Sequence, residues 1–190
     1  MTIAFSSSSP IASVALIDGE GNVICERSKE ARQNAGGVLL DLLDGLLDKA
    51  GRKLEEAELF AADLGPGSFT GVRVGVTVCK TMAYACDVQV VGADAFDLID
   101  PERPVAIPSR KGEHFLRLPG SAPVVVRDLP EGVVGYGPAF EAARYPAAKA
   151  FAPLLATCGA KDPEQMVPLY IAEPSISTPK DPRVRGGPVA

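Results

Sequence analysis

The sequence has no tryptophan, a single histidine and no pair of cysteines in a C-x-x-C arrangement. A structural zinc site requires four clustered Cys or His ligands. A hydrolase of the Ser-His-Asp type requires a histidine beside its nucleophile, and His114 lies on a predicted strand without a serine or cysteine close in sequence. We therefore predict no metal site, no catalytic residue and scattered reduced thiols at Cys25, Cys79, Cys86 and Cys158.

Long apolar runs and an excess of positive charge are also missing. No apolar stretch approaches the roughly 18 residues of a transmembrane helix, and Met1–Ser6 lacks the basic segment of a secretory signal. The net charge of −5 argues against an independent nucleic-acid-binding protein, which needs a basic face. These absences predict a cytoplasmic protein without a membrane partner, in which any RNA contact comes through another subunit.

The 190 residues have room for one ordinary domain or two small lobes. The pattern of the first half of the sequence predicts an antiparallel meander of three strands, followed by alternating helices and parallel strands. This order is typical of a ribonuclease-H-like α/β fold with a mixed five-stranded sheet. The predicted strands are Thr2–Phe5, Ile11–Ile17, Val23–Arg27, Leu59–Asp63 and Val88–Val91, and the predicted helices are 34–51, 71–87 and Ala95–Ile99.

A glycine-rich loop, Gly65-Pro66-Gly67-Ser68-Phe69-Thr70-Gly71, follows the fourth strand. Glycine takes positive φ at little cost, so the loop predicts a tight turn in which Ser68 or Thr70 caps the next helix. A strand, a glycine loop and a helix start also form a backbone cradle for phosphate. The loop matches neither the dinucleotide fingerprint nor the P-loop, which favours a structural turn. The candidate phosphate contacts are Gly65, Gly67, Ser68, Thr70 and Gly71.

The two long helices are predicted from their apolar patterns. In residues 71–79 valines alternate with other residues as in a strand, but the absence of proline and the loss of alternation after Cys79 favour a helix. Leucines cover a broad arc of the helix over 34–51, which Asn34 can cap and Gly51 can end. Core packing and an interface with another chain both explain this arc.

The run Gly65–Gly92, GPGSFTGVRVGVTVCKTMAYACDVQVVG, resembles the signature segment of the TsaB (YeaZ) family of bacterial tRNA-modification proteins. A looser similarity extends from Thr2–Phe5 to Val167–Ile171. The resemblance implies an actin-like ATPase fold with a reduced second lobe. In that superfamily the turn after the first strand typically carries an aspartate that manages metal and phosphates, often within Ile-Asp-Thr in TsaB-like sequences.

Aligned on the following SVAL, this chain has Phe5-Ser6-Ser7 at that turn. A serine lacks the anionic oxygen that a Mg²⁺ site requires. We therefore expect no ATP hydrolysis and no cofactor on this chain, with any ATP held by the partner.

The resemblance also implies the role of a non-catalytic scaffold in the complex that makes N6-threonylcarbamoyladenosine next to the tRNA anticodon. A TsaD-like subunit would carry the catalysis, a TsaE-like ATPase would assist, and the isolated chain would form a homodimer. The family pairs through a bundle of its first helix and the helix after the glycine loop. The expected contact residues are Leu39, Leu43, Leu46, Leu47, Val72, Gly75, Val76, Cys79 and Ala83.

The remainder of the chain predicts a first lobe over 1–100, a shortened second lobe over 101–172 and a flexible proline-rich tail over 173–190. At the first hairpin of the second lobe, Arg110 and Glu113 match a TsaB-like pattern, but Pro108 replaces its aspartate, and their role stays open. The second lobe is predicted to contain strands Val105–Ile107, Glu113–Leu118, Val124–Arg127 and Val133–Tyr136 and a final helix, Ala147–Cys158.

Two other classes of function are considered. A small ATPase or kinase of the actin-like superfamily would hold phosphates in the glycine loop. A metallopeptidase, suggested by older glycoprotease labels on this superfamily, conflicts with the single histidine.

Overall fold

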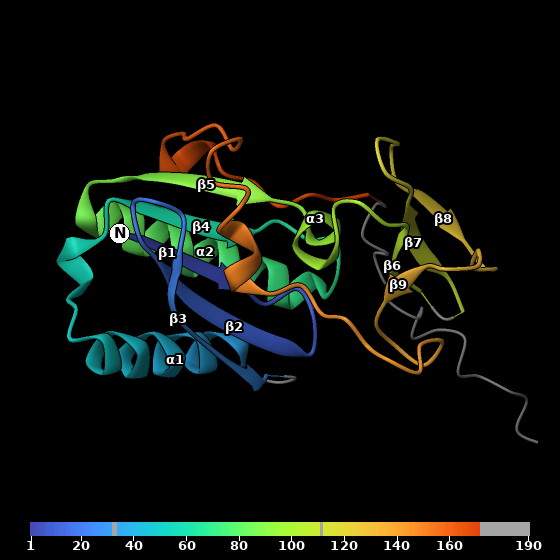
Figure 1. Ribbon diagram of the computed structural model, residues 1–190, viewed down its shortest axis with the longest axis horizontal. Coiled ribbons are helices and arrows are strands. Elements are labelled where there is room, and N and C mark those ends of the chain that lie inside the picture. The colour runs from blue at the N-terminus through green and yellow to red at the C-terminus, as the bar shows by residue number, and fades with distance from the viewer. Residues whose placement is uncertain (32–33, 111, 172–190) are drawn as a thin grey trace, which may run out of the picture.

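The computed structural model describes residues 1–31, 34–110 and 112–171. Two lobes lie side by side along the long axis of the molecule (Figure 1). The first contains a five-stranded sheet and the two long helices, and the second contains a four-stranded sheet. None of the helices in the described ranges is both long and apolar enough to cross a membrane.

The five-stranded sheet has the order β3-β2-β1-β4-β5. β1 pairs antiparallel with β2 and parallel with β4, and β4 pairs parallel with β5, so the predicted mixed sheet is confirmed. β3 continues three residues past the predicted Arg27, because an exposed edge strand accommodates charged side chains. The strands are β1 (Thr2–Ser6), β2 (Ile11–Ile17), β3 (Val23–Glu30), β4 (Leu59–Asp63) and β5 (Gln89–Ala93).

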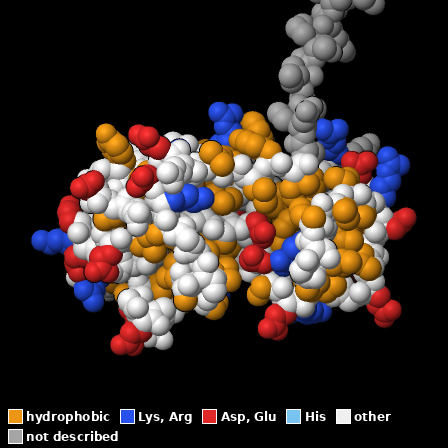
Figure 2. Space-filling view, turned by 90° about the horizontal axis from the view of Figure 1, so that it is seen from above, with side chains coloured by type: hydrophobic (Ala, Val, Ile, Leu, Met, Phe, Trp, Pro, Cys, Tyr) orange, Lys and Arg blue, Asp and Glu red, His pale blue; other side chains and the backbone are white. Residues whose placement is uncertain are grey.

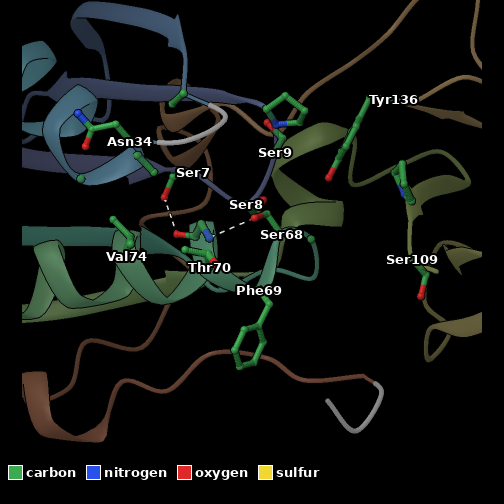
Figure 3. Close-up of a pocket in the computed structure, with 17 residues that line it drawn as sticks. Ser7, Ser8, Ser9, Asn34, Ser68, Phe69, Thr70, Val74, Ser109 and Tyr136 are labelled. Carbon is green, nitrogen blue, oxygen red and sulfur yellow. Dashed lines mark hydrogen bonds between the residues drawn. The ribbon is translucent and has the colours of Figure 1, made fainter. Parts of the chain in front are cut away.

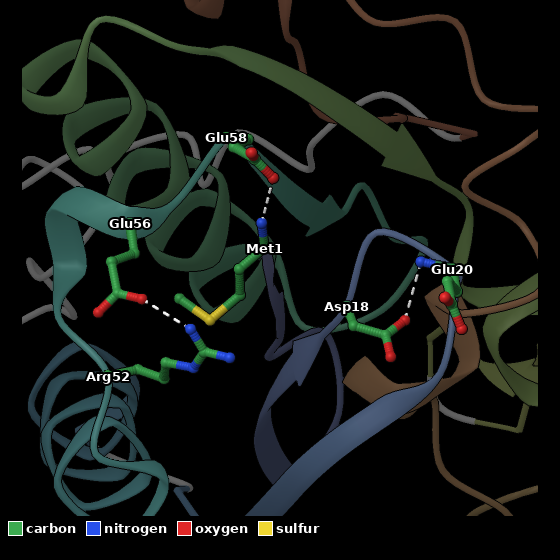
Figure 4. A network of polar contacts seen from close by, with 6 residues as sticks. All are labelled: Met1, Asp18, Glu20, Arg52, Glu56 and Glu58. Carbon is green, nitrogen blue, oxygen red and sulfur yellow. Dashed lines mark hydrogen bonds and ion pairs between the residues drawn. The ribbon is translucent and has the colours of Figure 1, made fainter.

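The β2–β3 hairpin is closed by Asp18, whose carboxylate accepts hydrogen bonds from the amide of Glu20 (Figure 4) and from that of Asn22. Hydrogen bonds from Asn22 lower the pKa of Asp18. At the same end of the molecule Arg52 pairs with Glu56 at 2.9 Å, and the amino group of Met1 pairs with Glu58. Such exposed ion pairs contribute little to stability.

Helices α1 (Ala35–Ala50) and α2 (Phe69–Cys86) cover one face of this sheet and share one apolar core with it. α1 begins where the side chain of Asn34 accepts from the amide of Gly37 and ends at Gly51, which has a φ of 61°. α2 shows that the alternating valines belong to a helix, with Ser68 as its N-cap. A 3₁₀ turn (η1, Leu54–Glu56) leads from α1 into β4.

The opposite face of the sheet is covered by α3 (Ala95–Ile99) and by a 3₁₀ helix, η2 (Ala148–Phe151). The predicted helix over Ala147–Cys158 is wrong, because only η2 is helical and hydrogen-bonded turns follow it. Pro153 explains the difference, since proline lacks an amide hydrogen and clashes with the carbonyl four residues earlier. Phe151 is nevertheless fully buried, as its apolar spacing predicted.

The second sheet has the order β8-β7-β6-β9, in which β6 pairs antiparallel with β7 and parallel with β9. α3 joins the lobes, because Phe96 packs into the core of the second sheet whereas Leu98 packs under the first. Arg117 on β7 donates to Asp97 at 2.5 Å and to the carbonyl of Asp100 at 3.0 Å. The strands are β6 (Val105–Pro108), β7 (His114–Arg117), β8 (Val124–Val126) and β9 (Val134–Gly135).

The chain then returns to the first lobe. Lys161 forms an isolated antiparallel β-bridge with Val90. A 3₁₀ turn (η3, Pro163–Gln165) follows, and Met166 is buried in the core that α1 and α2 share with the first sheet. Within the predicted second lobe, 101–172, the side chains of Ala148, Phe151 and Met166 pack in the cores of the first sheet, whereas Ile171 packs against the core of the second. The predicted tail, 173–190, lies outside the described residues.

Candidate functional site

The glycine-rich loop packs directly on the serine turn that follows β1. A Cβ atom at Gly67 would lie 2.1 Å from the carbonyl oxygen of Ser8, and one at Gly71 would lie 2.0 Å from that of Ser7. Gly65, with a φ of 84°, turns the chain at the end of β4. The glycines thus permit two backbones to approach more closely than any side chain would allow.

Three of the six amides of this loop, those of Gly65, Ser68 and Gly71, have acceptors within the chain. The amide of Ser68 donates to the Ser8 carbonyl at 2.6 Å, and that of Gly71 donates to the Ser68 hydroxyl at 3.2 Å. The amides of Gly65 and Val72 are also bonded, to Asp63 and Ser68. A phosphate cradle requires free amides that point at the ligand, so Gly65, Ser68 and Gly71 would have to give up these bonds to hold a phosphate.

Asp63, at the end of β4, was not among the predicted site residues. Its Oδ2 accepts from the hydroxyls of Ser6 at 2.7 Å and Ser8 at 2.5 Å, and its Oδ1 accepts from the amide of Gly65 at 2.8 Å. Burial raises its pKa, and the hydrogen bonds from Ser8, Ser6 and Gly65 oppose the rise. The sequence feature that could have identified Asp63 is an acidic residue at the end of an apolar strand, just before the glycine loop.

The carboxylate therefore stands beside the serine that occupies the place of the family's aspartate. Asp63 is 2% exposed, and both of its oxygens accept hydrogen bonds from the chain itself. Such an acid is satisfied without a cation. Ser6 to Ser9 are all buried as well, so the polar turn is an internal structure.

A pocket of about 850 Å³ opens between the lobes above this turn (Figure 3). Its polar groups come from the serine turn, from Asn34 at the start of α1, from Ser68 and Thr70 at the start of α2, and from Ser109 and Tyr136 of the second lobe. None of the described residues that line it is charged. Mg-ATP requires cationic groups for its phosphates and carboxylates around its metal, so the described lining does not fit that ligand.

The nine residues expected to contact a partner are instead buried in the core of the chain. Leu43, for example, is 3% exposed and packs with Val76 and the first sheet. These side chains pack between α1, α2 and the first sheet. In this position they are not available for contact with another protein. The residues concerned are Leu39, Leu43, Leu46, Leu47, Val72, Gly75, Val76, Cys79 and Ala83.

The outward side of α2 carries a shallow apolar groove of about 370 Å³, lined by Phe69, Thr70, Arg73, Val74, Thr77 and Val78. We call it the α2 groove. Phe69 is 47% exposed and its ring lies 5.7 Å from that of Tyr170, which is also exposed. The guanidinium of Arg73 lies over the Phe69 ring, 5.2 Å from its centre. Apolar surface thus remains uncovered along this helix.

The other charged and polar candidates have neighbours within the second lobe. His114 packs edge-on against Phe140, and Glu113 pairs with Arg127 at 3.4 Å. Within the described ranges no three Cys, His, Asp or Glu residues are grouped as metal ligands. The space-filling view shows the charged side chains spread over the surface, many of them at the end of the first lobe far from the second (Figure 2).

The sheet order, the two helices on one face and the interlobe pocket define a ribonuclease-H-like fold with a reduced second lobe. Two solved structures share it. An uncharacterized protein with similarity to peptidase YEAZ from Pseudomonas aeruginosa superimposes with a TM-score of 0.78 at 24% identity, over 90% of this chain and 99% of that one. YeaZ from Pseudomonas aeruginosa gives a TM-score of 0.73 at 21% identity, over 89% and 99% of the two chains.

Sequence comparison adds matches to TsaD and TsaB proteins. The TsaD family model, tRNA N6-adenosine threonylcarbamoyltransferase, matches residues 28–98. TsaB from Haemophilus influenzae is 32% identical over 123 residues, or 60% of this chain and 51% of that protein, and TsaB from Bacillus subtilis is 29% identical over 60% and 46%. The chain thus spans about half the length of these curated relatives. Together with the fold, these matches support the resemblance to the TsaB (YeaZ) family that the sequence predicted.

Proposed function

We propose that this chain acts in tRNA threonylcarbamoyladenosine biosynthesis as a non-catalytic scaffold that pairs with a TsaD-like subunit through the outward sides of α1 and α2. The names of the matched relatives support the pathway, since they include both TsaB proteins and a tRNA N6-adenosine threonylcarbamoyltransferase of Zymomonas mobilis. In this proposal tRNA is contacted through the complex, any nucleotide is bound by the partner, and a TsaE-like ATPase is a further component of the complex.

The observation that carries the pairing is the α2 groove. Exposed apolar side chains in a continuous patch usually mark a contact with another macromolecule. Phe69 and Tyr170 supply the aromatic part of this patch, and Val74 and Val78 supply its aliphatic floor. The neighbouring outward side of α1 exposes Leu40 with Asp41, Asp44 and Asp48. An apolar stripe beside an acidic one fits a partner helix with basic flanks.

The non-catalytic part rests on the surroundings of the pocket. Ser6 supplies no anionic oxygen, the Asp63 carboxylate is fully engaged inside the chain, and the lone His114 has no nucleophile beside it. General acid–base or nucleophilic chemistry requires such groups to face a substrate.

Co-purification with the TsaD-like subunit of the same organism tests the pairing. Phe69→Asp and Thr77→Asp place a charge in the α2 groove at exposed positions outside the core, and we expect each to remove the partner. Leu118→Asp is the matched control, because Leu118 is a similarly exposed apolar residue on the second lobe, with 45% exposure. Circular dichroism verifies that all three variants are folded. Retention of the partner by both groove variants would refute the interface, as would loss of the partner in the control.

The alternative is nucleotide binding by this chain, and one observation favours it. The starts of two long helices, at Asn34 and Ser68, both line the interlobe pocket, and helix starts attract phosphate. Calorimetry with Mg-ATP on the isolated chain separates the two proposals. Micromolar binding that Thr70→Glu abolishes would support this alternative, and no measurable heat is the expected result.

A further inference from the structure

The buried Asp63 carboxyl contacts the connection between the lobes through a single serine. The Ser6 hydroxyl lies 2.7 Å from Asp63 Oδ2 and 3.1 Å from the carbonyl oxygen of Pro146. Pro146 is buried at the point where the chain returns from the second lobe, two residues before Ala148, whose amide donates to Ser13 on β2 at 2.9 Å. A hydroxyl has one proton, so Ser6 donates fully to only one of its two acceptors.

The charge of Asp63 decides between these acceptors. An ionised carboxylate is the stronger acceptor, so both Ser6 and Ser8 donate to it. When Asp63 takes up one proton from solvent on Oδ2, the new O–H becomes a donor and the Ser6 oxygen becomes its acceptor. The Ser6 proton then turns to the Pro146 carbonyl. No covalent bond other than the new O–H forms, and none breaks.

We propose that Asp63, Ser6 and Pro146 form a proton-linked latch, which ties the returning segment to β1 when Asp63 is protonated and releases it when Asp63 is ionised. The latch is independent of the proposed pairing, because it lies at the base of the lobes and not on the α2 groove.

The surroundings of Asp63 are suited to such a response. From β1 and its turn only uncharged Ser6 and Ser8 face it, and from the glycine loop only the amide of Gly65. From the second lobe Tyr136 is the titratable group near it, and burial followed by the charge of Asp63 raises the pKa of Tyr136. No lysine or arginine in the described ranges is recorded in contact with Asp63.

The direction of the linkage follows from burial, which raises the pKa of Asp63 in the folded chain above the unfolded value of about 3.9. The stability that the latch adds is therefore fully present below the unfolded pKa and is lost as the pH rises through the folded pKa.

Hydrogen exchange of the Ala148 amide in the full chain, corrected for intrinsic rates and measured across the acidic pH range, tests the latch. We expect protection to fall about fivefold in the wild type as Asp63 ionises, the equivalent of one hydrogen bond. Asp63→Asn, whose amide donates to Ser6 permanently, should keep the high protection at every pH. Ser6→Ala should keep the low protection at every pH. Ser9→Ala is the matched control, because among the described residues the Ser9 hydroxyl bonds only to Ile11.

Infrared spectroscopy supplies the second readout, since a protonated buried carboxyl has its own carbonyl band, which Asp63→Asn must remove. Three results would overturn the latch: absence of that band down to acid unfolding, a pH step in Ser6→Ala equal to that of the wild type, or equal protection in Asp63→Asn and Ser6→Ala. If Asp63→Asn fails to fold, the Ser6→Ala and Ser9→Ala profiles decide.

Discussion

The Gly71→Ala substitution distinguishes the effect of helix propensity from that of packing, because the two predict opposite changes in the stability of the protein. Gly71 lies in the first turn of α2, and its backbone is not in the positive-φ region. Alanine is the better helix former by up to about 1 kcal/mol, so propensity alone predicts a more stable protein. The structure predicts the reverse, since the new Cβ would lie 2.0 Å from the Ser7 carbonyl oxygen, where ordinary contact begins at 3.4 Å.

The size of the effect follows from what must move. The clashing atom belongs to the backbone, so α2 and the serine turn have to separate as units. That separation strains the Ser7 hydroxyl bond to the Gly71 carbonyl (2.9 Å) and the Ser68 amide bond to the Ser8 carbonyl (2.6 Å). Overpacking costs about 1–3 kcal/mol and a lost hydrogen bond about 1 kcal/mol. After the gain in propensity, we expect a net destabilisation of about 2–3 kcal/mol.

Urea unfolding followed by circular dichroism measures this difference. Gly159→Ala is the matched control, because a Cβ there meets nothing within 4 Å and its φ is not positive. The control should stay within about 0.5 kcal/mol of the wild type, and the thermal midpoint of Gly71→Ala should fall by about 5–10 °C. A Gly71→Ala protein as stable as the wild type, or more stable, would show that the close approach of α2 to the serine turn is wrong.

Two further substitutions test the core and the lobe junction. Leu43→Asp places a charge at a site that is 3% exposed and should cost about 3 kcal/mol or more; circular dichroism showing a native fold with an unchanged midpoint would contradict the burial of this face of α1. Arg117→Met removes the hydrogen bonds to Asp97 and to the Asp100 carbonyl, which should cost about 2 kcal/mol and speed proteolysis between the lobes. A cleavage rate equal to that of wild type would show that Arg117 does not hold the lobes together.

Local patterns were sufficient for most of the fold. Ile11–Ile17, Leu59–Asp63 and Ala95–Ile99 have the predicted bounds, because apolar runs, glycine turns and capping residues act over a few positions. The helical assignment of Phe69–Cys86 also depended on local information, since the alternation fails after Cys79. The prediction of a final helix was wrong for a local reason, because Pro153 lies within its apolar stripe.

Those patterns did not indicate which apolar side chains are buried in the core and which are exposed. The broad leucine arc of α1 had two explanations, and the structure places Leu39, Leu43 and Leu46 in the core while leaving Leu40 outside. The difference depends on how far the sheet curves around the helix, which is set by strands distant in sequence. For the same reason no pattern in Pro101–Ile171 indicated that Met166 completes the first core.

The sequence by itself determined the strands, the two long helices, the glycine loop and the family resemblance, because these depend on residue type and on spacing along the chain. Only the tertiary structure decided that Asp63 of β4 lies against Ser6 of β1, 57 positions away, and that the glycine loop packs on the serine turn. Close approach and burial are properties of segments brought together from far apart, and a charge or an amide has a defined partner only once that packing exists.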